Sequence, residues 1–257
     1  MCRHLVWLGA RRPLASLLHD PPHSLEHQSH KTFEQRWVTM NADGWGVGWW
    51  DPEAGDTPAR YRTDKPMWAD RSFRSVADVV RSGAFVAAVR AATPGTPVVE
   101  TGSAPFASGP WLFSLNGYVS DFPGPAADRL RRRLSPARSA ALEGTTDSEV
   151  LFGLVLDLVD EGVAPEVAAA RVAADVLAGS TGELNLLLSD GRHAIATTGG
   201  NTLYALVDAG LAEGGTLLAS EPLDDHEGWT AISDRALVVA TADGYRTEPL
   251  TAAEGAA

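Results

Sequence analysis

The chain starts with Met1-Cys2-Arg3-His4-Leu5-Val6-Trp7-Leu8-Gly9, in which the only cysteine directly precedes an apolar segment. We expect residues 3–9 to form a strand. Methionine is commonly removed when the following residue is small, which would leave Cys2 with a free α-amine beside its thiol. The ordinary pKa of such an amine is roughly 7.7–8.0, so its unprotonated fraction can act as a general base for the Cys2 side chain. The alternative is an incidental or buried thiol near the chain end.

The composition describes an acidic chain with enough apolar residues for a substantial core. The 257 residues are 44% hydrophobic and carry a formal net charge of −12, which argues against binding to nucleic acid or to anionic membranes. No apolar run approaches the ~18 residues of a membrane span, and the N-terminus lacks the pattern of a signal peptide. A single cysteine cannot form an internal disulfide. We therefore expect one cytoplasmic domain over residues 1–257.

Further along the chain, the pattern predicts strands near both ends and helices in the middle. Helices are expected at residues 70–82, 147–161 and 165–179, with Thr146 as an N-cap and Glu149 completing a capping box. A polar loop is expected at 19–36, and the basic residues from 129 to 138 are expected on a solvated helix. The expected strands are 3–9, 43–50, 84–92, 111–120, 183–189, 192–198, 202–207, 216–220, 236–241 and 245–250. This order indicates an α+β fold with layered sheets and helices.

Three short segments carry side chains suited to binding and catalysis. Arg90 and Thr93 follow an apolar strand, where a guanidinium can hold a substrate carboxylate, although an ordinary ion pair is the alternative. Asn116 and Gly117 place an amide beside a flexible backbone N–H, as an oxyanion hole requires, or they simply end a strand. Asp147 can accept hydrogen bonds from a substrate ammonium, or it only complements the helix dipole.

Four histidines offer a competing interpretation. His19, His23, His27 and His30 lie close together in sequence, and an i,i+4 spacing can place imidazoles on one helical face for a metal ion. Pro21 and Pro22 interrupt such a helix, however, and the sequence lacks a motif such as HExxH. A solvent-exposed loop is the favoured interpretation, and we expect no metal site.

Taken in order, the motifs resemble those of the class II glutamine amidotransferases, which are N-terminal nucleophile hydrolases. The resemblance covers essentially the whole chain and implies a four-layer αββα sandwich. It rests on five segments: Met1-Cys2-Arg3-His4-Leu5, Asn41-Ala42-Asp43-Gly44-Trp45-Gly46, Arg90-Ala91-Ala92-Thr93, Asn116-Gly117 and Thr146-Asp147-Ser148-Glu149.

The resemblance also implies a role for each candidate residue. Cys2 would be the nucleophile that attacks a γ-glutamyl amide, and Asn116 and Gly117 would form the oxyanion hole. Arg90 would hold the α-carboxylate of the γ-glutamyl group, and Asp147 would hold its α-ammonium. The implied partner is a small γ-glutamyl substrate, with no metal or cofactor.

Within this family the chain is most similar to the amidohydrolases of ergothioneine biosynthesis. The similarity rests on Pro21-Pro22-His23-Ser24-Leu25, Asn41-Ala42-Asp43-Gly44 and Ala219-Ser220-Glu221-Pro222-Leu223. Two departures put glutamine itself in doubt as the substrate: Leu115 stands where many members have histidine, and Ser103-Ala104-Pro105-Phe106 replaces Thr-His-Pro-Phe. The alternatives are a general glutaminase or γ-glutamyl amide hydrolase of the same fold, and a non-catalytic binding protein on that scaffold.

The substrate of those amidohydrolases carries a trimethylammonium group, which aromatic faces can bind. The chain contains eight tryptophans. We expect one of Trp45, Trp49, Trp50 or Trp68 to contribute to this binding, with Trp45 as the substrate-binding candidate. Trp49 and Trp50 should point to opposite faces of one strand. The alternative is that all four are core residues.

Overall fold

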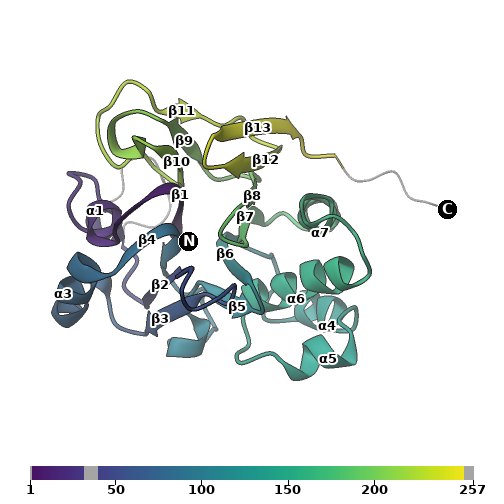
Figure 1. Cartoon of the computed structure of the whole chain (residues 1–257). Coiled ribbons are helices and arrows are strands. Elements are labelled where there is room, and N and C mark those ends of the chain that lie inside the picture. The colour runs from purple at the N-terminus through teal and green to yellow at the C-terminus, as the bar shows by residue number, and fades with distance from the viewer. Residues whose placement is uncertain (1, 32–39, 252–257) are drawn as a thin grey trace.

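Two antiparallel sheets lie face to face at the centre of the protein (Figure 1). The computed structural model describes residues 2–31 and 40–251. The larger sheet has the strand order β11-β9-β10-β1-β4-β2-β3, and the smaller has the order β13-β12-β8-β7-β6-β5. The strands are β1 (Arg3–Pro13), β2 (Trp45–Trp49), β3 (Ala59–Thr63), β4 (Arg81–Val89), β5 (Phe106–Ser108), β6 (Trp111–Tyr118), β7 (Glu183–Ser189), β8 (Ala194–Thr197), β9 (Tyr204–Val207), β10 (Gly215–Ala219), β11 (Thr230–Ala231), β12 (Ala236–Thr241) and β13 (Gly244–Pro249).

Helices cover the outer face of each sheet. The larger sheet carries α1 (Ala15–Leu18), α2 (Leu25–His30) and α3 (Arg71–Val79), while α6 (Asp147–Asp160) and α7 (Pro165–Gly179) pack on the smaller sheet. The short helices α4 (Pro125–Arg131) and α5 (Pro136–Ala140) flank α6, as Figure 1 shows. Short 3-10 turns form η1 (Met67–Ala69), η2 (Glu100–Gly102) and η3 (Gly210–Ala212). The expected four-layer αββα arrangement is confirmed.

The alternation of side chains along β1 explains how two layers share this strand. Leu5 and Trp7 belong to the core between the larger sheet and its helices. Val6 and Leu8 belong to a separate core between the two sheets. All four are almost fully buried, because a strand between two layers presents apolar residues on both faces.

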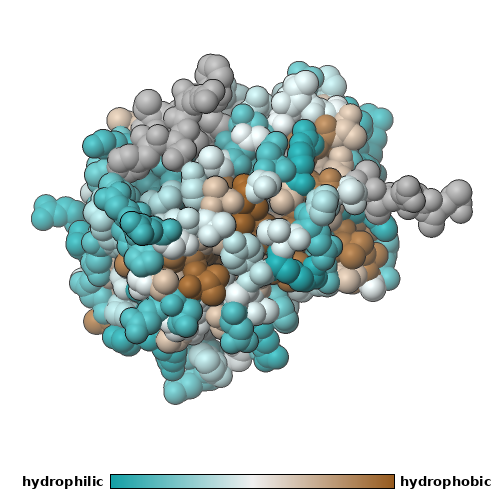
Figure 2. All heavy atoms as spheres, turned by 90° about the horizontal axis from the view of Figure 1, so that it is seen from above, coloured by the Kyte–Doolittle hydropathy of each residue, from teal (hydrophilic) through white to brown (hydrophobic). Residues whose placement is uncertain are grey.

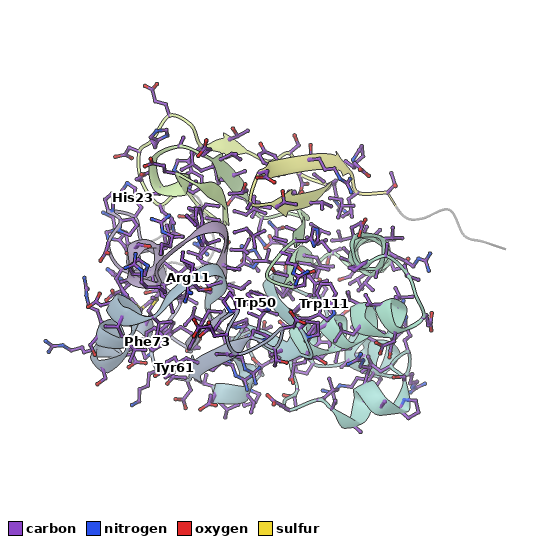
Figure 3. The ribbon with its side chains drawn as sticks, in the orientation of Figure 1. Arg11, His23, Trp50, Tyr61, Phe73 and Trp111 are labelled. Atoms are coloured by element: carbon purple, nitrogen blue, oxygen red, sulfur yellow. The ribbon has the colours of Figure 1, made fainter. Side chains whose placement is uncertain are left out.

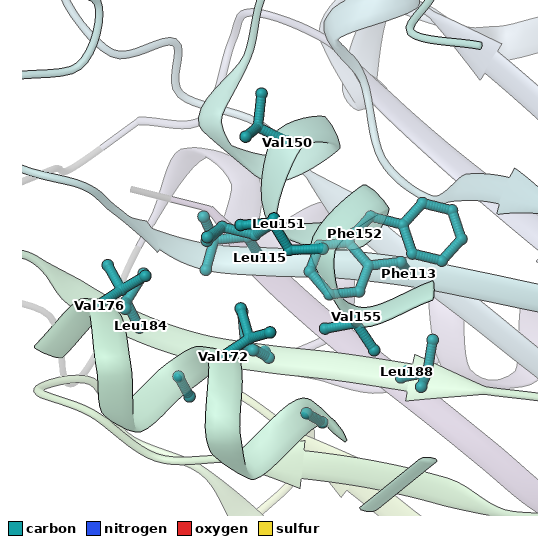
Figure 4. Packing of buried hydrophobic residues seen from close by; sticks show 14 of the residues in the cluster. Phe113, Leu115, Val150, Leu151, Phe152, Val155, Val172, Val176, Leu184 and Leu188 are labelled. Atoms are coloured by element: carbon teal, nitrogen blue, oxygen red, sulfur yellow. The ribbon is translucent and has the colours of Figure 1, made fainter. Parts of the chain in front are cut away.

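The core between the smaller sheet and its helices is the third apolar layer. Figure 4 shows how Val150, Leu151 and Val155 of α6 and Val172 of α7 meet β6 and β7. The Phe113 and Phe152 rings stack here with their centroids 5.1 Å apart. This packing fixes the start of α6 relative to the end of β6, where the candidate residues lie.

The principal helices and most strands lie where the sequence predicts them, with shifts at their ends. Residues 165–179, 183–189 and 236–241 form the expected elements with the expected bounds. Thr146 caps α6 as predicted, because its side chain accepts from the Glu149 N–H. The reciprocal half of the capping box is not formed. The Glu149 carboxylate instead accepts from the N–H groups of Glu143 and Gly144, at 2.9 and 3.1 Å.

The expectation of a loop throughout residues 19–36 is wrong for residues 25–30, which form α2. Pro21 and Pro22 precede this helix rather than interrupt it. Ser24 supplies the N-cap by accepting from the His27 N–H, which satisfies one of the donors that a helix start exposes. The remainder of that predicted loop, residues 32–36, lies outside the described residues.

Two further expectations about helices need correction. The sequence predicts that Phe73, Val76, Val79 and Val80 share the apolar face of the 70–82 helix. In α3 the buried side chains are instead Phe73 and Ala77, whereas Val76 and Val79 are 40% and 74% exposed. The basic residues from 129 to 138 are divided among α4, α5 and the turn between them, rather than lying on one helix. Pro136 begins the second of these helices, as proline does at a first helical position.

One face of the protein is predominantly polar (Figure 2). Figure 2 shows one face of the molecule, on which hydrophilic residues surround small apolar areas near the centre. Among the helices in the described part of the chain, none has the length and apolar character needed to cross a membrane.

Candidate active site

Strand pairing brings Cys2 and Arg90 to the same end of the larger sheet. In the β1–β4 pair, Arg3 lies opposite Val89. Because the strands are antiparallel, the residue before Arg3 and the residue after Val89 are neighbours. Leu5 and Trp7 face the outer core, so Cys2 continues the even-numbered face of β1, which is directed at the smaller sheet. The nucleophile candidate therefore faces the end of β6.

A pocket opens at this point and gathers five of the seven predicted site residues. Cys2, Arg90, Thr93, Gly117 and Asp147 all line it. The space amounts to ≈ 460 Å³ including the part open to solvent. Its other walls are formed by Ala88, Val89, Ala91, Thr96, Gly102, Ala104, Phe106, Leu115, Thr146 and Ser148. Four segments that are distant in sequence thus meet at one cavity.

Arg90 is buried, and backbone groups hold its guanidinium in place. Nη1 donates to the Asp43 carbonyl at 3.3 Å, and Nη2 donates to the Pro97 carbonyl at 3.1 Å. A Cβ on Gly102 would lie 2.9 Å from the guanidinium, so a side chain at this position would displace it. Within residues 2–31 and 40–251, no carboxylate lies within 4.0 Å of the Arg90 nitrogens. A buried cation without a carboxylate partner is suited to an anionic ligand.

Asp147 supplies the opposite charge at the start of α6. One carboxylate oxygen accepts from the Val119 N–H at 2.9 Å, and the other accepts from the Ser148 N–H at 2.8 Å. Burial raises the pKa of Asp147 above the ordinary carboxyl value, although these hydrogen bonds oppose the shift. The carboxylate is therefore held in place at a cost in desolvation, as is common for a group that binds a ligand.

The raised pKa of Asp147 has a consequence for stability. A carboxyl whose pKa rises on folding stabilises the folded state most at low pH, and that contribution is lost as the pH rises through the raised pKa. The Asp147→Asn variant has no titrating group there. Its free energy of unfolding relative to the wild type should therefore increase as the pH rises from below the ordinary carboxyl pKa through the raised pKa, as measured by urea unfolding. A difference that stays constant or decreases would contradict a raised pKa.

Asn116 and Gly117 lie at the end of β6, as the oxyanion interpretation requires. Gly117 has a φ of +148°, and a Cβ there would lie 1.8 Å from the Glu183 carbonyl, so glycine is required. Asn116 is fully buried and does not line the pocket. Its Nδ2 donates to Ser220 Oγ at 3.4 Å. The two predicted donors are thus adjacent in the strand, and only Gly117 contributes to the pocket wall.

Two polar residues next to Cys2 in sequence are buried. Arg3 forms an ion pair with Glu221, with 3.0 Å between Nε and Oε1 and both side chains fully buried. His4 contacts Ser114, with 3.2 Å between Nδ1 and Oγ, and burial lowers the pKa of His4 to about 3. A neutral His4 does not provide a cation at the thiol.

A comparison with known protein families identifies the family of this chain. The class II glutamine amidotransferase profile matches residues 24–213, which is most of the chain. The chain belongs to the class II glutamine amidotransferases. Membership agrees with the arrangement of Cys2, Arg90 and Asp147 around one pocket.

Curated relatives within this family resemble the chain over nearly its full length. The γ-glutamyl-hercynylcysteine sulfoxide hydrolase of Mycolicibacterium smegmatis is 42% identical over 238 residues, which cover 93% of this chain and 95% of that protein. The protein of the same name from Mycobacterium tuberculosis is 39% identical, with 99% of each chain covered.

Solved structures of class II amidotransferases share the fold. A glutamine aminotransferase class-II domain protein from Silicibacter pomeroyi superposes with a TM-score of 0.70 at 26% identity, covering 97% of this chain and 100% of that chain. The glutamine phosphoribosylpyrophosphate amidotransferase of B. subtilis has a TM-score of 0.66 at 15% identity, covering 98% of this chain and 49% of that chain. The second likeness supports the fold alone.

The two positions where this chain departs from the expected family pattern both lie in the pocket. Leu115 and Ala104 are among its lining residues, as is Phe106 of the same altered segment. Sequence reasoning assigned these positions no role. Their contact with the cavity follows from strand pairing, because β5 and β6 run side by side with Phe106 opposite Phe113. The departures therefore make part of the pocket wall apolar.

The tryptophans expected to bind a cation lie elsewhere. Trp45 is buried in the outer core, where its ring packs on Phe73 with centroids 4.8 Å apart. Trp49 borders the same core, and Trp50 packs between the sheets, so the two do point to opposite faces. Figure 3 shows Trp50 between the sheets and Phe73 on the outer side. None of the four tryptophans, including Trp68, lines the pocket at Cys2.

The histidine-rich segment forms a row of ring contacts rather than a coordination sphere. The ring centroids of His23 and His27 are 6.0 Å apart, and those of His27 and His30 are 5.3 Å apart. His19 instead contacts Glu26, with 2.6 Å between Nδ1 and Oε2. Within the described ranges, no group of three or more His, Cys, Asp or Glu residues is arranged to hold a metal ion.

Proposed function

We propose that this chain is a cysteine-dependent amidohydrolase of ergothioneine biosynthesis. It cleaves the γ-glutamyl amide of γ-glutamyl-hercynylcysteine sulfoxide to glutamate and hercynylcysteine sulfoxide. The names of the relatives that are 39–42% identical over nearly the whole chain support this substrate. The chain's single cysteine is compatible with a reducing compartment, and we place the reaction in the cytoplasm.

The observation that carries the proposal is the convergence of Cys2, Arg90 and Asp147 on one pocket. A γ-glutamyl group has an α-carboxylate, an α-ammonium and a carbonyl at its far end. Arg90 is a buried cation held only by carbonyl groups in the described chain, and it complements the α-carboxylate. Asp147 complements the ammonium. The thiol of Cys2 is then left to meet the γ-carbonyl.

The reaction proceeds in two steps through a thioester. The α-amine of Cys2, exposed once Met1 is removed, takes the thiol proton, and sulfur attacks the γ-carbonyl carbon. Asn116 and Gly117 stabilise the negative charge on the carbonyl oxygen. The protonated α-amine then gives its proton to the leaving nitrogen as the C–N bond breaks. Water hydrolyses the thioester, which releases glutamate and regenerates the thiol. Met1 itself lies outside the described residues.

The experiment that tests the function is release of glutamate by the purified protein from γ-glutamyl-hercynylcysteine sulfoxide and from glutamine, measured side by side. A clear preference in kcat/KM for the sulfoxide supports the proposed pathway. Equal or better use of glutamine would keep the Cys2 chemistry and reject the substrate. Release from neither would reject hydrolysis and favour a binding protein.

The role of Arg90 predicts a specific defect in the Arg90→Lys variant. Lysine keeps the charge but lacks the planar fork that binds a carboxylate through two hydrogen bonds. We expect kcat/KM to fall by about 10–100-fold, mostly through KM, since a hydrogen bond to a charged group is worth about 1.5–3 kcal/mol. Steady-state kinetics with the sulfoxide substrate measures this. An unchanged KM would show that Arg90 does not hold the carboxylate.

The exposed Arg74→Lys substitution is the matched control. Arg74 lies on α3 and is half exposed, with Asp20 and Glu26 as its nearby carboxylates. Because it does not line the pocket, its substitution should leave KM at the wild-type value.

A further inference from the structure

A dipeptide far from Cys2 in sequence contacts the two residues that follow it, Arg3 and His4. Ser220 and Glu221 follow β10, and both are fully buried. The Ser220 N–H donates to the His4 carbonyl at 2.9 Å, which extends the pairing of β10 with β1 toward the N-terminus. Neither residue lines the pocket. Their contacts instead connect the nucleophile strand with the oxyanion strand.

The Ser220 hydroxyl forms hydrogen bonds to residues of both strands. Its Oγ accepts from the His4 N–H at 3.0 Å and from Asn116 Nδ2 at 3.4 Å, and it donates to the His4 carbonyl at 3.2 Å. One donor and two acceptor positions are all that a serine hydroxyl has. The hydroxyl is thus fully used, and it holds the Asn116 amide of the smaller sheet against β1 of the larger sheet.

Glu221 forms a buried ion pair with Arg3, the residue that follows Cys2. Its carboxylate binds Arg3 Nε, and Arg3 Nη1 donates to the Cys2 carbonyl at 3.1 Å. Removing one partner of a buried ion pair is costly because the other charge is left uncompensated. The Ser220–Glu221 pair therefore fixes both the backbone at the nucleophile and the side chain of the oxyanion donor.

We propose that Ser220 is a positioning residue that orients the Asn116 amide toward the oxyanion. An amide nitrogen carries two hydrogens in a fixed plane, so holding one against Ser220 Oγ sets the direction of the other. The inference rests on the proposed hydrolysis and on Asn116 as an oxyanion donor. Ser220 itself does not touch the substrate, and its effect passes through Asn116.

The first test is kinetic, on Ser220→Ala and Ser220→Cys. Alanine removes the hydroxyl, while cysteine fills the space with a weak acceptor. We expect both variants to lower kcat by about 10-fold with KM nearly unchanged, because an oxyanion donor acts in the transition state. Ser82→Ala is the matched control: Ser82 is also fully buried, and its hydroxyl lies within hydrogen-bond distance of the carbonyls of Trp50 and Ala84. It should lower stability without changing kcat.

The decisive test combines Ser220→Ala with Asn116→Ala. If Ser220 acts through Asn116, the double variant should have the same kcat as Asn116→Ala alone. If the losses of kcat from Ser220→Ala and Asn116→Ala instead multiply in the double variant, the proposal is overturned. A Ser220→Cys variant with wild-type kcat would also overturn it. A wild-type protein that releases no glutamate from any γ-glutamyl amide would instead overturn the proposed function, so the two failures are distinguishable.

Discussion

The Cys2→Ala variant is expected to lose hydrolysis of γ-glutamyl amides by at least about 10⁴-fold, as for removal of a nucleophile in other covalent hydrolases. The variant retains an α-amine but has no sulfur to form the thioester. Cys2 lines the pocket beside Arg90 and Gly117, and it is the only cysteine in the sequence. No other thiol can replace it. Glutamate release at saturating substrate measures the loss.

Binding provides the control for this variant. Arg90 and Asp147 are unchanged in Cys2→Ala, so the protein should still bind glutamate and the intact substrate in calorimetry. Retained binding without turnover separates a lost nucleophile from a lost fold. Turnover within tenfold of the wild type would show that another group carries out the attack.

The second large effect is expected for Asn116→Ala. Removing one oxyanion donor typically lowers kcat by 10²–10³-fold, and KM should change little because the charge develops only in the transition state. Initial rates of glutamate release over a range of substrate concentrations give kcat and KM separately. A change confined to KM would show that Asn116 acts on the bound substrate instead.

Asn185→Ala is the control for Asn116→Ala. Asn185 lies opposite Asn116 in the β6–β7 pair and is also fully buried. Its amide contacts the backbone of residues 199–202 rather than the pocket. The control should lower the free energy of unfolding, while its kcat should exceed that of Asn116→Ala by at least tenfold.

Elements with long periodic patterns could be predicted with their bounds, whereas three short strands were missed. The α7 helix and β7 carry enough apolar residues to define their own bounds. The missed strands β3, β5 and β11 contain five, three and two residues. Such strands exist because a neighbouring strand offers hydrogen bonds, and this partner is not visible in the local sequence.

In the candidate site, too, some residues could be predicted from the sequence and others could not. Residue types and order pointed to Cys2, Arg90 and Asp147, and the pocket contains all three. The apolar wall at Ala104 and Leu115 and the support from Ser220 were missed, since both depend on which strands are neighbours. In the sequence, the Ala219–Leu223 segment indicates only a resemblance to relatives. A buried serine directly after a strand paired with the nucleophile strand is the signal that could have found it.

The placement of Trp45 illustrates a further limit of composition as a guide. Its aromatic face suits a cation, yet alternation along β2 directs it to the outer core with Val47. The pairing of Trp45 with Val89 of β4 fixes that orientation, because a shift by one residue would move every side chain of the strand to the other face.

The most direct test of the account is mass analysis of the protein after acid quenching during turnover of the γ-glutamyl substrate. We predict an N-terminal peptide that begins at Cys2, lacks Met1 and carries one glutamyl group bound as a thioester. The adduct should accumulate when thioester hydrolysis is slow and should be absent from Cys2→Ala. A fully active protein that retains Met1, or a glutamyl group attached to any other residue, would contradict Cys2 as an N-terminal nucleophile.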